Sequence, residues 1–293
     1  MTSTAQSESG TLGRVLLKHA REAFRSQDVA RAEWQALRFT LEPDVARALE
    51  EYDRFVDLLR MSGTDLCFLD AATQVSLDSI YVRDASVVCD RGAILCRMGK
   101  AERRGEPAAQ EAALRQIGVP VLGRIVSPGT LEGGDVAWLD TRTIAVGRGY
   151  RTNDAGIAQL GTLLGDTIDE MIVVSLPHWR GPGDVFHLMS IVSPIDRDLA
   201  VVYSPLMPVP FRERLLEREM SLVEVPDEEF ASLGANVLSI APRRCIMLQG
   251  NPITRARLEE AGVEVLEYDG ANISLKGGGG PTCLTRPLTR IGH

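Results

Sequence analysis

A cysteine behind a run of glycines is the first feature of this sequence that could do chemistry. Cys283 follows Gly277–Gly280, Pro281 and Thr282. Glycines reach φ > 0 without strain and allow the backbone to approach a ligand closely. No Lys-Ser/Thr pair follows them, as a phosphate-binding P-loop requires. The stretch therefore favours a planar, charged small molecule beside a nucleophilic Cys283, although a glycine-rich turn with a buried structural cysteine would look the same.

A histidine that could pair with this cysteine lies in an apolar run. His187 is flanked by Phe186 and Leu188, whereas His178 lies in a Pro/Gly-rich turn. A single histidine in such a run is commonly a hydrogen-bonded core residue. With a cysteine nucleophile elsewhere in the chain, His187 also becomes a candidate general acid and base.

Acidic residues and arginines are the third group of residues that could take part in this chemistry, as ligands of a charged substrate. Carboxylates match the planar fork of a guanidinium or amidinium ion, and Asp78, Asp84 and Glu132 could hold such a cation. Arg103 and Arg151 could hold a carboxylate at the other end of the same molecule. Residues 78–89 would also suit an edge strand with solvated charges, and the Gly-Gly pair in 131–135 would suit a plain hairpin turn.

The elements that must position these residues mix strands and helices. Strand-like runs include 78–89, 92–98, 143–146 and 186–192, and helical spacing begins at Pro43 and ends near Gly63. Strands and helices do not alternate strictly, which argues against a TIM barrel or a Rossmann fold. We expect one α/β domain of several ββαβ-like units, residues 11–293, behind a disordered tail, residues 1–10. No internal sequence repeat is visible.

Composition narrows the class of protein. The net charge of −8 argues against nucleic acid as the main partner. Five cysteines without a CxxC pair or zinc spacing indicate free thiols in a reducing compartment, which we take to be the cytoplasm. No signal peptide and no membrane span are expected. The sequence indicates no metal site and no cofactor.

Four motifs together resemble one known superfamily. They are DSIYVRD (78–84), LEGGD (131–135), FHL (186–188) and GGGGPTC (277–283). In this order they resemble the guanidino-group-modifying enzymes of pentein fold, which include arginine deiminases, dimethylarginine dimethylaminohydrolases, arginine dihydrolases and amidinotransferases. Arg103 and Arg151 each lie 19 residues after a motif acid, where the family places arginines that clamp the substrate carboxylate.

The resemblance implies a fold, a reaction and a role for each residue. The fold is a closed, fivefold pseudo-symmetric propeller of ββαβ units. Cys283 is the nucleophile, His187 the general acid and base, and Asp84 and Glu132 bind the guanidinium. Further ligands of the substrate are Asp78, Arg103 and Arg151. The partner implied is a small arginine-like molecule, with no metal, cofactor, nucleic acid or membrane, and a homo-oligomer is compatible with the family.

Departures from the family patterns favour some branches. Arginine deiminases and amidinotransferases carry an aspartate two residues after the site histidine, where this chain has Met189. The dimethylarginine enzymes also lack that aspartate, and the GGGGPTCLTRPL loop resembles the dihydrolases. We therefore expect hydrolysis of arginine or a methylarginine through a covalent amidino-thioether on Cys283, giving citrulline or ornithine. Transfer of the amidino group to an amine acceptor is the alternative.

Overall fold

Five small sheets arranged in a closed circuit make up the chain. The computed structural model describes residues 3–72, 74–184 and 186–292. Each sheet contains an antiparallel pair followed by a third, parallel strand, and the chain reaches that third strand through a helical segment. Consecutive sheets contact one another around the whole circuit. The expected fivefold ring of ββαβ units is therefore confirmed.

Four of the sheets follow one another along the chain. They consist of β4 (Ser86–Cys89), β5 (Gly92–Leu95) and β6 (Val121–Arg124); β7 (Val136–Trp138), β8 (Thr143–Arg148) and β9 (Glu170–Ser175); β10 (Val192–Asp196), β11 (Leu199–Val202) and β12 (Ser221–Glu224); and β13 (Leu238–Ala241), β14 (Arg244–Leu248) and β15 (Glu264–Tyr268). Their connecting helices are α4 (Glu106–Gln116), α5 (Asp154–Leu164), α6 (Val209–Glu217) and α8 (Pro252–Glu260), and a short α7 (Asp227–Phe230) precedes β13.

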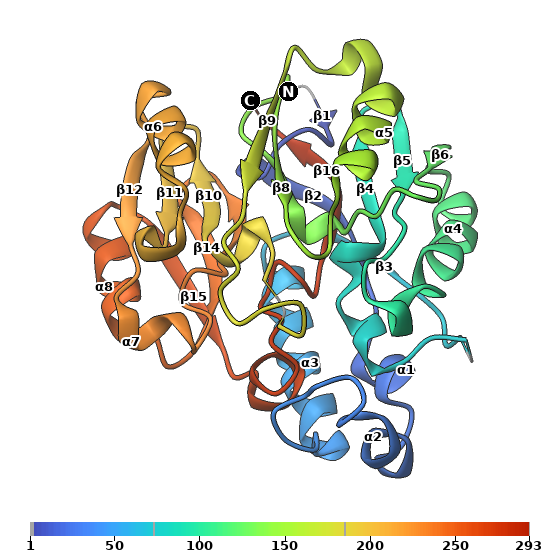
Figure 1. Ribbon diagram of the computed structural model, residues 1–293. Coiled ribbons are helices and arrows are strands. Elements are labelled where there is room, and N and C mark those ends of the chain that lie inside the picture. The colour runs from blue at the N-terminus through green and yellow to red at the C-terminus, as the bar shows by residue number, and fades with distance from the viewer. Residues whose placement is uncertain (1–2, 73, 185, 293) are drawn as a thin grey trace.

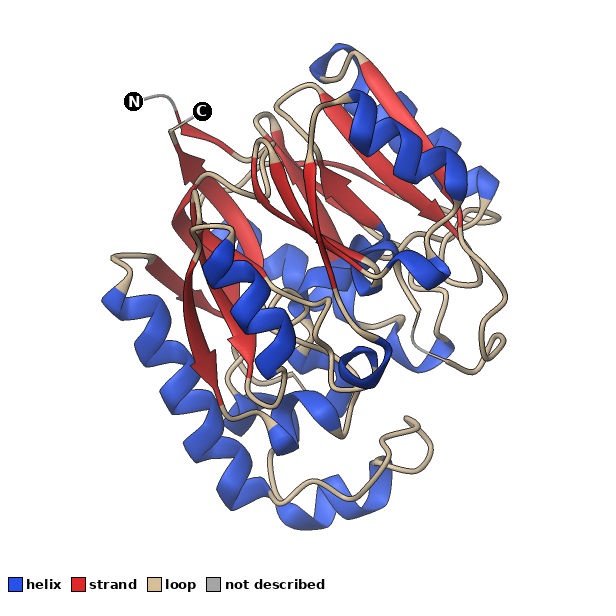
Figure 2. Cartoon of the chain, turned by 90° about the vertical axis from the view of Figure 1, so that its left-hand side faces the viewer, coloured by secondary structure: helices blue, strands red, loops and turns tan. Residues whose placement is uncertain are grey.

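The remaining sheet joins the two ends of the chain and closes the ring. It has the order β1 (Ser3–Thr4), β16 (Arg286–Ile291), β2 (Thr11–Leu17) and β3 (Asp65–Phe68). The connection between β2 and β3 contains α1 (Ala20–Phe24), α2 (Gln27–Glu33) and α3 (Val45–Met61). Figures 1 and 2 both show the two termini side by side, as the pairing of β1 with β16 requires.

The predicted disordered tail is wrong for residues 3–10. Ser3 pairs with Ile291, and the side chains of Gln6 and Glu8 are buried. These polar groups find partners inside the protein. Gln6 Nε2 donates to the backbone oxygens of two residues at 2.5 and 3.0 Å, and Glu8 forms an ion pair with Arg83. The polar composition of residues 3–10 suggested that they are exposed to solvent. Polar residues can equally be buried when they are hydrogen-bonded.

Two predicted strands are instead turns that lead into strands. Residues 77–85 form two 3₁₀ turns, and the strand begins only at Ser86. Residues 188–190 form another 3₁₀ turn, and β10 begins at Val192. The charged side chains in these segments turn inward rather than lying on an edge strand: Asp84 is 3% exposed. Two helices, α1 and α2, were not predicted, and their short lengths gave little helical periodicity to detect.

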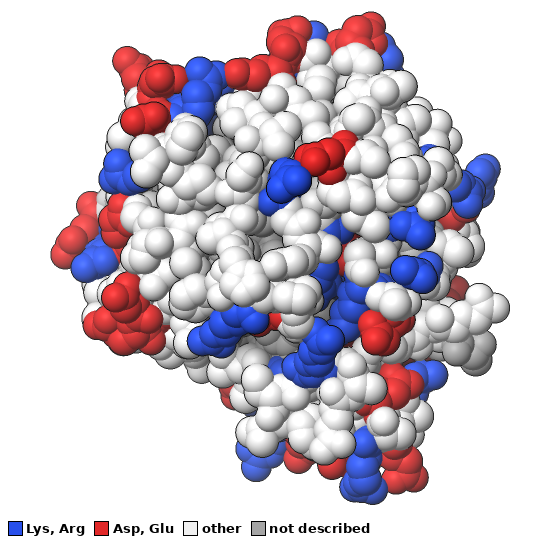
Figure 3. Space-filling model, in the orientation of Figure 1, with Lys and Arg blue, Asp and Glu red and all other residues white. Residues whose placement is uncertain are grey.

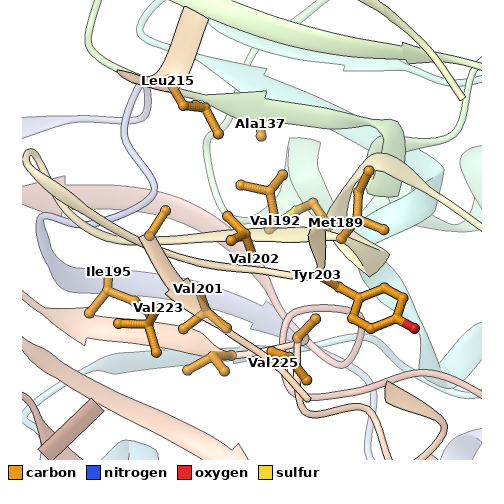
Figure 4. Close-up of a cluster of buried hydrophobic side chains, with 14 of the residues drawn as sticks. Ala137, Met189, Val192, Ile195, Val201, Val202, Tyr203, Leu215, Val223 and Val225 are labelled. Carbon is orange, nitrogen blue, oxygen red and sulfur yellow. The ribbon is translucent and has the colours of Figure 1, made fainter. Parts of the chain in front are cut away.

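A large hydrophobic cluster anchors the turn that carries His187. Leu188 and Met189 belong to the same buried cluster as Val192 and Val202. Figure 4 shows Met189 beside Val192 and Val202, with Tyr203 next to it. Packing of these apolar side chains fixes the chain on the C-terminal side of the histidine.

Candidate active site

The glycines before Cys283 pack against side chains of the protein itself. A Cβ on Gly277 would lie 2.0 Å from Tyr81 Oη, and one on Gly280 would lie 2.5 Å from Asn236 Cγ. Real Cβ atoms never approach so closely, so only glycine fits at these positions. Gly277 also lines the pocket beside Cys283. The sequence predicted that the glycine backbone lies close to a ligand. In the structure this backbone lies close to neighbouring side chains of the protein and also borders the pocket.

The thiol of Cys283 has two polar neighbours. Asn236 Nδ2 lies 3.4 Å from Cys283 Sγ, and Thr282 Oγ1 lies 3.9 Å from it. Burial, together with the negative charge of Asp84, raises the pKa of the thiol, and the contacts with Thr282 and Asn236 offset only part of this. The thiol therefore keeps its proton at neutral pH while the pocket holds no cation.

His187 is held by a fully buried carboxylate. Its Nε2 lies 2.8 Å from Glu132 Oε2. Burial opposes the charged imidazolium, but Asp84, Asp135 and Glu132 outweigh it and raise the pKa of His187 to about 9. The hydrogen bond from His187 and the charge of Arg151 hold the pKa of Glu132 below its usual range despite burial. At neutral pH the pair is therefore an imidazolium donating to a carboxylate.

Asp84 is fixed on both oxygens. Its Oδ2 accepts from Arg103 Nη1 at 2.5 Å, and its Oδ1 accepts from the backbone nitrogen of Gly134 at 3.0 Å. Burial opposes ionisation, but Arg103 and His187 together lower the pKa of Asp84. Arg103 also donates to Glu106 and to two backbone oxygens. Arg103 therefore supports Asp84 and contributes little free hydrogen-bonding capacity to a ligand.

The remaining predicted ligands lie around the same pocket. Arg151 donates through Nη1 to Glu132 Oε2 at 2.9 Å. Asp78 Oδ2 accepts from Lys100 Nζ at 2.5 Å, and Lys100 also donates through its backbone nitrogen to Glu132 Oε1. Lys100 was not predicted from the sequence. It compensates the charge of Asp78 and helps to orient Glu132.

These side chains surround two connected hollows on either side of Cys283. One of about 190 Å³ has apolar walls, with basic side chains also in its lining; these residues include Phe186, Met189, Phe230, Arg38, Arg180 and Lys276. The narrower one, of about 20 Å³, is lined by all the predicted site residues except Glu132, which lies behind His187. Figure 3 shows several basic side chains near the middle of this face, with a few acidic ones beside them, and charged side chains of both signs around the periphery. The surface therefore attracts an anionic group, such as a carboxylate, towards an inner pair of acids.

Comparison with known proteins identifies the family. Residues 26–290 match the family model described as N,N dimethylarginine dimethylhydrolase, eukaryotic. The chain belongs to this family. A dimethylarginine dimethylaminohydrolase from Streptomyces coelicolor is 33% identical over 248 residues, which is 85% of this chain and 88% of that protein.

Solved structures agree with this family assignment. A dimethylarginine dimethylaminohydrolase variant from Pseudomonas aeruginosa, in complex with citrulline, has a TM-score of 0.74 and 25% identity, with 96% of this chain and all of that chain covered. An amidinotransferase of saxitoxin biosynthesis from Microseira wollei has a TM-score of 0.80 over 99% of this chain and 98% of that chain, at 16% identity. The second similarity shows the shared fold only.

One cluster of this dimethylarginine dimethylaminohydrolase family member has the composition of a metal site. Ligand atoms of Asp84, Glu132 and His187 all lie within 4.8 Å of one another. Arg103 and Arg151 already donate to these carboxylates, and His187 carries a proton at neutral pH. An imidazolium cannot ligate a metal. The arrangement suits a planar cation with hydrogen-bond donors better than a metal ion.

The site also contains residues that the motifs did not reveal. Asn236 contacts the thiol from the loop before β13, and no local pattern marks it. Asp135 lies inside the LEGGD motif. Its Oδ1 accepts from the backbone nitrogen of Leu188 at 3.0 Å, which fixes the residue after His187. Burial raises the pKa of Asp135 to about 6. Glu106, at the start of α4, binds Arg103 through both carboxylate oxygens.

Proposed function

We propose that the chain hydrolyses the guanidinium group of a methylated arginine, with Cys283 as nucleophile and His187 as general acid and base. The observation that carries this proposal is that Cys283, His187 and Asp84, from turns that precede three different sheets, line one pocket, with Glu132 buried behind His187. The family assignment supports the same chemistry. We include unmodified arginine in this proposal as a second substrate.

Binding of the cation prepares the nucleophile. Asp84 is ionised and lines the pocket, so it attracts a guanidinium and holds it with charge-assisted hydrogen bonds, while the ionised Glu132 behind His187 adds its negative charge. Its positive charge beside Cys283 favours the thiolate, and the thiol proton leaves to solvent. Substrate binding thereby counteracts the raised pKa that burial and Asp84 give the free thiol. Arg151 is the better candidate for the substrate carboxylate, because Arg103 is almost fully engaged.

The reaction then proceeds through two tetrahedral adducts. The Cys283 thiolate attacks the central guanidinium carbon, and His187 protonates the departing amine as its C–N bond breaks. The amidino group remains bound to sulfur as a cationic thioether. His187, now neutral, takes a proton from water while the hydroxyl oxygen bonds to the same carbon. The C–S bond breaks, the thiolate leaves, and loss of the remaining proton gives the neutral ureido product, citrulline.

An apolar wall supports a methylated substrate. Phe186 and Met189 line the hollow next to His187, and Met189 is 3% exposed. An aspartate at position 189 would hydrogen-bond an unsubstituted nitrogen, whereas the thioether contacts methyl groups without leaving a buried N–H unpaired. The structure thus favours a substituted terminal nitrogen over a bare one.

A product assay tests the proposal. Purified protein and Cys283→Ala would be given arginine, monomethylarginine, asymmetric dimethylarginine and agmatine, with products identified by mass spectrometry. We expect citrulline plus methylamine or dimethylamine from the wild type and none from the variant. Ornithine would indicate a second hydrolysis. Amidino transfer to an added amine, without citrulline, would replace the hydrolase proposal with an amidinotransferase, and turnover by Cys283→Ala would refute Cys283 as nucleophile.

The setting of the enzyme is part of the proposal. All five cysteines of the chain are free thiols, which is typical of proteins in a reducing compartment, so we propose that the chain acts in the cytoplasm. No helix among the described residues is long and apolar enough to cross a membrane. We propose that residues 3–292 form one catalytic domain, since the closing sheet joins both ends of the chain. We also propose that the chain can form a homo-oligomer, because the family is compatible with one. We propose that it has no nucleic-acid partner, because its net charge is negative.

A further inference from the structure

Three arginines that the proposed reaction does not use lie buried together next to the site. Arg83, Arg286 and Arg290 are at most 4% exposed. Arg286 donates through Nη2 to the backbone oxygen of Arg83. Arg290 donates through Nη1 to the backbone oxygens of Gly10 and Ser239, at 2.6 and 2.8 Å. Burial lowers the pKa of Arg286 to about 9 and of Arg290 to about 10, and the positive charge of Arg83 adds to both effects.

The positive charge of this cluster is compensated only in part. Glu8 Oε1 accepts from Arg83 Nη2 at 2.5 Å. Within residues 3–72, 74–184 and 186–292, no other carboxylate is hydrogen-bonded to any of the three guanidinium groups. Three cations therefore share one hydrogen-bonded anion in a site without solvent. Burying a charge without a partner is strongly unfavourable, so such a cluster needs a further anion.

The cluster also has unused hydrogen-bond donors. Five guanidinium nitrogens are buried and find no hydrogen-bond partner among the described residues: Arg83 Nε and Nη1, Arg286 Nε, and Arg290 Nε and Nη2. Buried donors in folded proteins almost always have a partner, and an unpaired group points to an ion or a water. Donors from three side chains near one carboxylate indicate that the partner accepts several hydrogen bonds at once.

A cavity separate from the hollows beside Cys283 borders Glu8, the carboxylate that pairs with Arg83. It has a volume of about 710 Å³ and is lined by residues of the N-terminal segment, among them Ser7, Glu8 and Ser9, and by the turns between β4 and β5 and between β7 and β8. Glu8 thus lies between this cavity and Arg83. This cavity shares no lining residue with the hollows beside Cys283, so a route past Glu8 to the arginines would not pass through the substrate pocket.

We propose that Arg83, Arg286 and Arg290 bind a small monovalent inorganic anion of the halide class, which shares the cluster with the carboxylate of Glu8. A halide accepts hydrogen bonds from several directions and donates none, which matches a set of N–H groups. The site is independent of the proposed hydrolase activity. Because Arg83 precedes Asp84 in the chain, the bound anion also keeps the arginines in place beneath the substrate-binding acid.

Halide binding can be tested on the full chain without an activity assay. Crystals grown with bromide would be measured at the bromine absorption edge. In parallel, thermal unfolding would be followed in chloride, bromide and gluconate at one ionic strength. We expect an anomalous peak among the three guanidinium groups. We also expect a saturable rise in Tm with halide, of about 5 °C at a hundred times Kd, over the value in gluconate.

Two variants sharpen this test. Glu8→Gln removes the competing carboxylate, so we expect half-saturation at about a tenfold lower halide concentration. Arg142→Gln changes an exposed arginine, which is 49% exposed and paired with Asp169, and should leave the halide dependence unchanged. Density for water alone, with equal Tm in halide and gluconate, would overturn the proposal. A halide effect that Arg142→Gln removes, or that Glu8→Gln weakens, would overturn it as well.

Discussion

Replacing Glu132 with glutamine should move the proton of His187 into a different pH range. Glutamine keeps the shape of the side chain and its hydrogen-bonding oxygen but removes one negative charge from the pair. Two delocalised charges about 4 Å apart interact by about 4 kcal/mol at an effective dielectric constant near 20. That energy corresponds to about three pKa units. The pKa of His187, about 9 in the intact site, should therefore fall to about 6.

The consequence is a changed pH profile. The imidazolium must protonate the leaving amine, so kcat/KM falls on the alkaline side of the pKa of His187. The wild type should keep its activity up to about pH 9. At pH 8, Glu132→Gln should have lost about 100-fold relative to its own maximum, because only about 1% of His187 is still protonated.

The assay is citrulline release at low substrate concentration from pH 5 to pH 10, combined with an NMR titration of His187. The matched control is Glu229→Gln. Glu229 is also buried, but it caps α8 through the backbone nitrogens of Ile253 and Thr254. Replacing Glu229 should lower the stability of the protein without changing the pH at which kcat/KM falls on the alkaline side. An alkaline limb of Glu132→Gln that stays within half a pH unit of the wild type would refute the assigned pairing.

Further predictions concern the surrounding contacts. Gly134→Ala would place a Cβ 2.7 Å from both Asp84 Oδ1 and His187 Nδ1, so kcat/KM should fall by about 100-fold or more, measured beside a folding check by circular dichroism. Asn236→Ala should raise the pKa of the Cys283 thiol further, which iodoacetamide alkylation rates across pH would show as a shift to higher pH; an unchanged profile would remove this role. His187 has a folded pKa of about 9 against an ordinary value of 6.5, so its contribution to stability is complete below pH 6.5 and lost as pH rises through 9. Urea unfolding of wild type and His187→Gln should therefore converge above pH 9.

The sequence predicted the chemistry of the site better than the shape of its surroundings. Cys283 and His187 alone could each have been structural, as the four other buried cysteines show, but together with the motif acids and their order along the chain they indicated guanidine chemistry. The contacts of Arg103 could not be predicted, because a free arginine and one saturated by Asp84 and Glu106 look identical in sequence. The polar residues 3–10 raised the same problem, since burial of Glu8 depends on Arg83, 75 residues away.

Local strand propensity also gave a wrong prediction of secondary structure where charged side chains face the interior. The β-branched run around Asp84 suggests a strand, but a strand would send alternate side chains to opposite faces. The 3₁₀ turns at 77–80 and 82–85 instead bury Asp78, Arg83 and Asp84 together. The pairing energy of these charges outweighs the strand preference of their neighbours, which is a tertiary effect that a local pattern does not contain.

The ring explains why residues so far apart in the chain meet, and why one of them escaped notice. Each sheet contributes a side chain from the segment just before the first strand of its antiparallel pair. These are Asp84 before β4, Glu132 before β7, His187 before β10, Asn236 before β13 and Cys283 before β16. Because the five units repeat around one circuit, these positions converge: Asp84, His187, Asn236 and Cys283 line the hollows, and Glu132 lies behind His187.

Position in the ring, rather than residue type, therefore identifies Asn236 as the fifth member. Its contact with Cys283 Sγ at 3.4 Å agrees with this placement. The units share the path of the chain, but each places a different chemical group at the equivalent position: carboxylates at Asp84 and Glu132, an imidazole at His187, an amide at Asn236 and a thiol at Cys283.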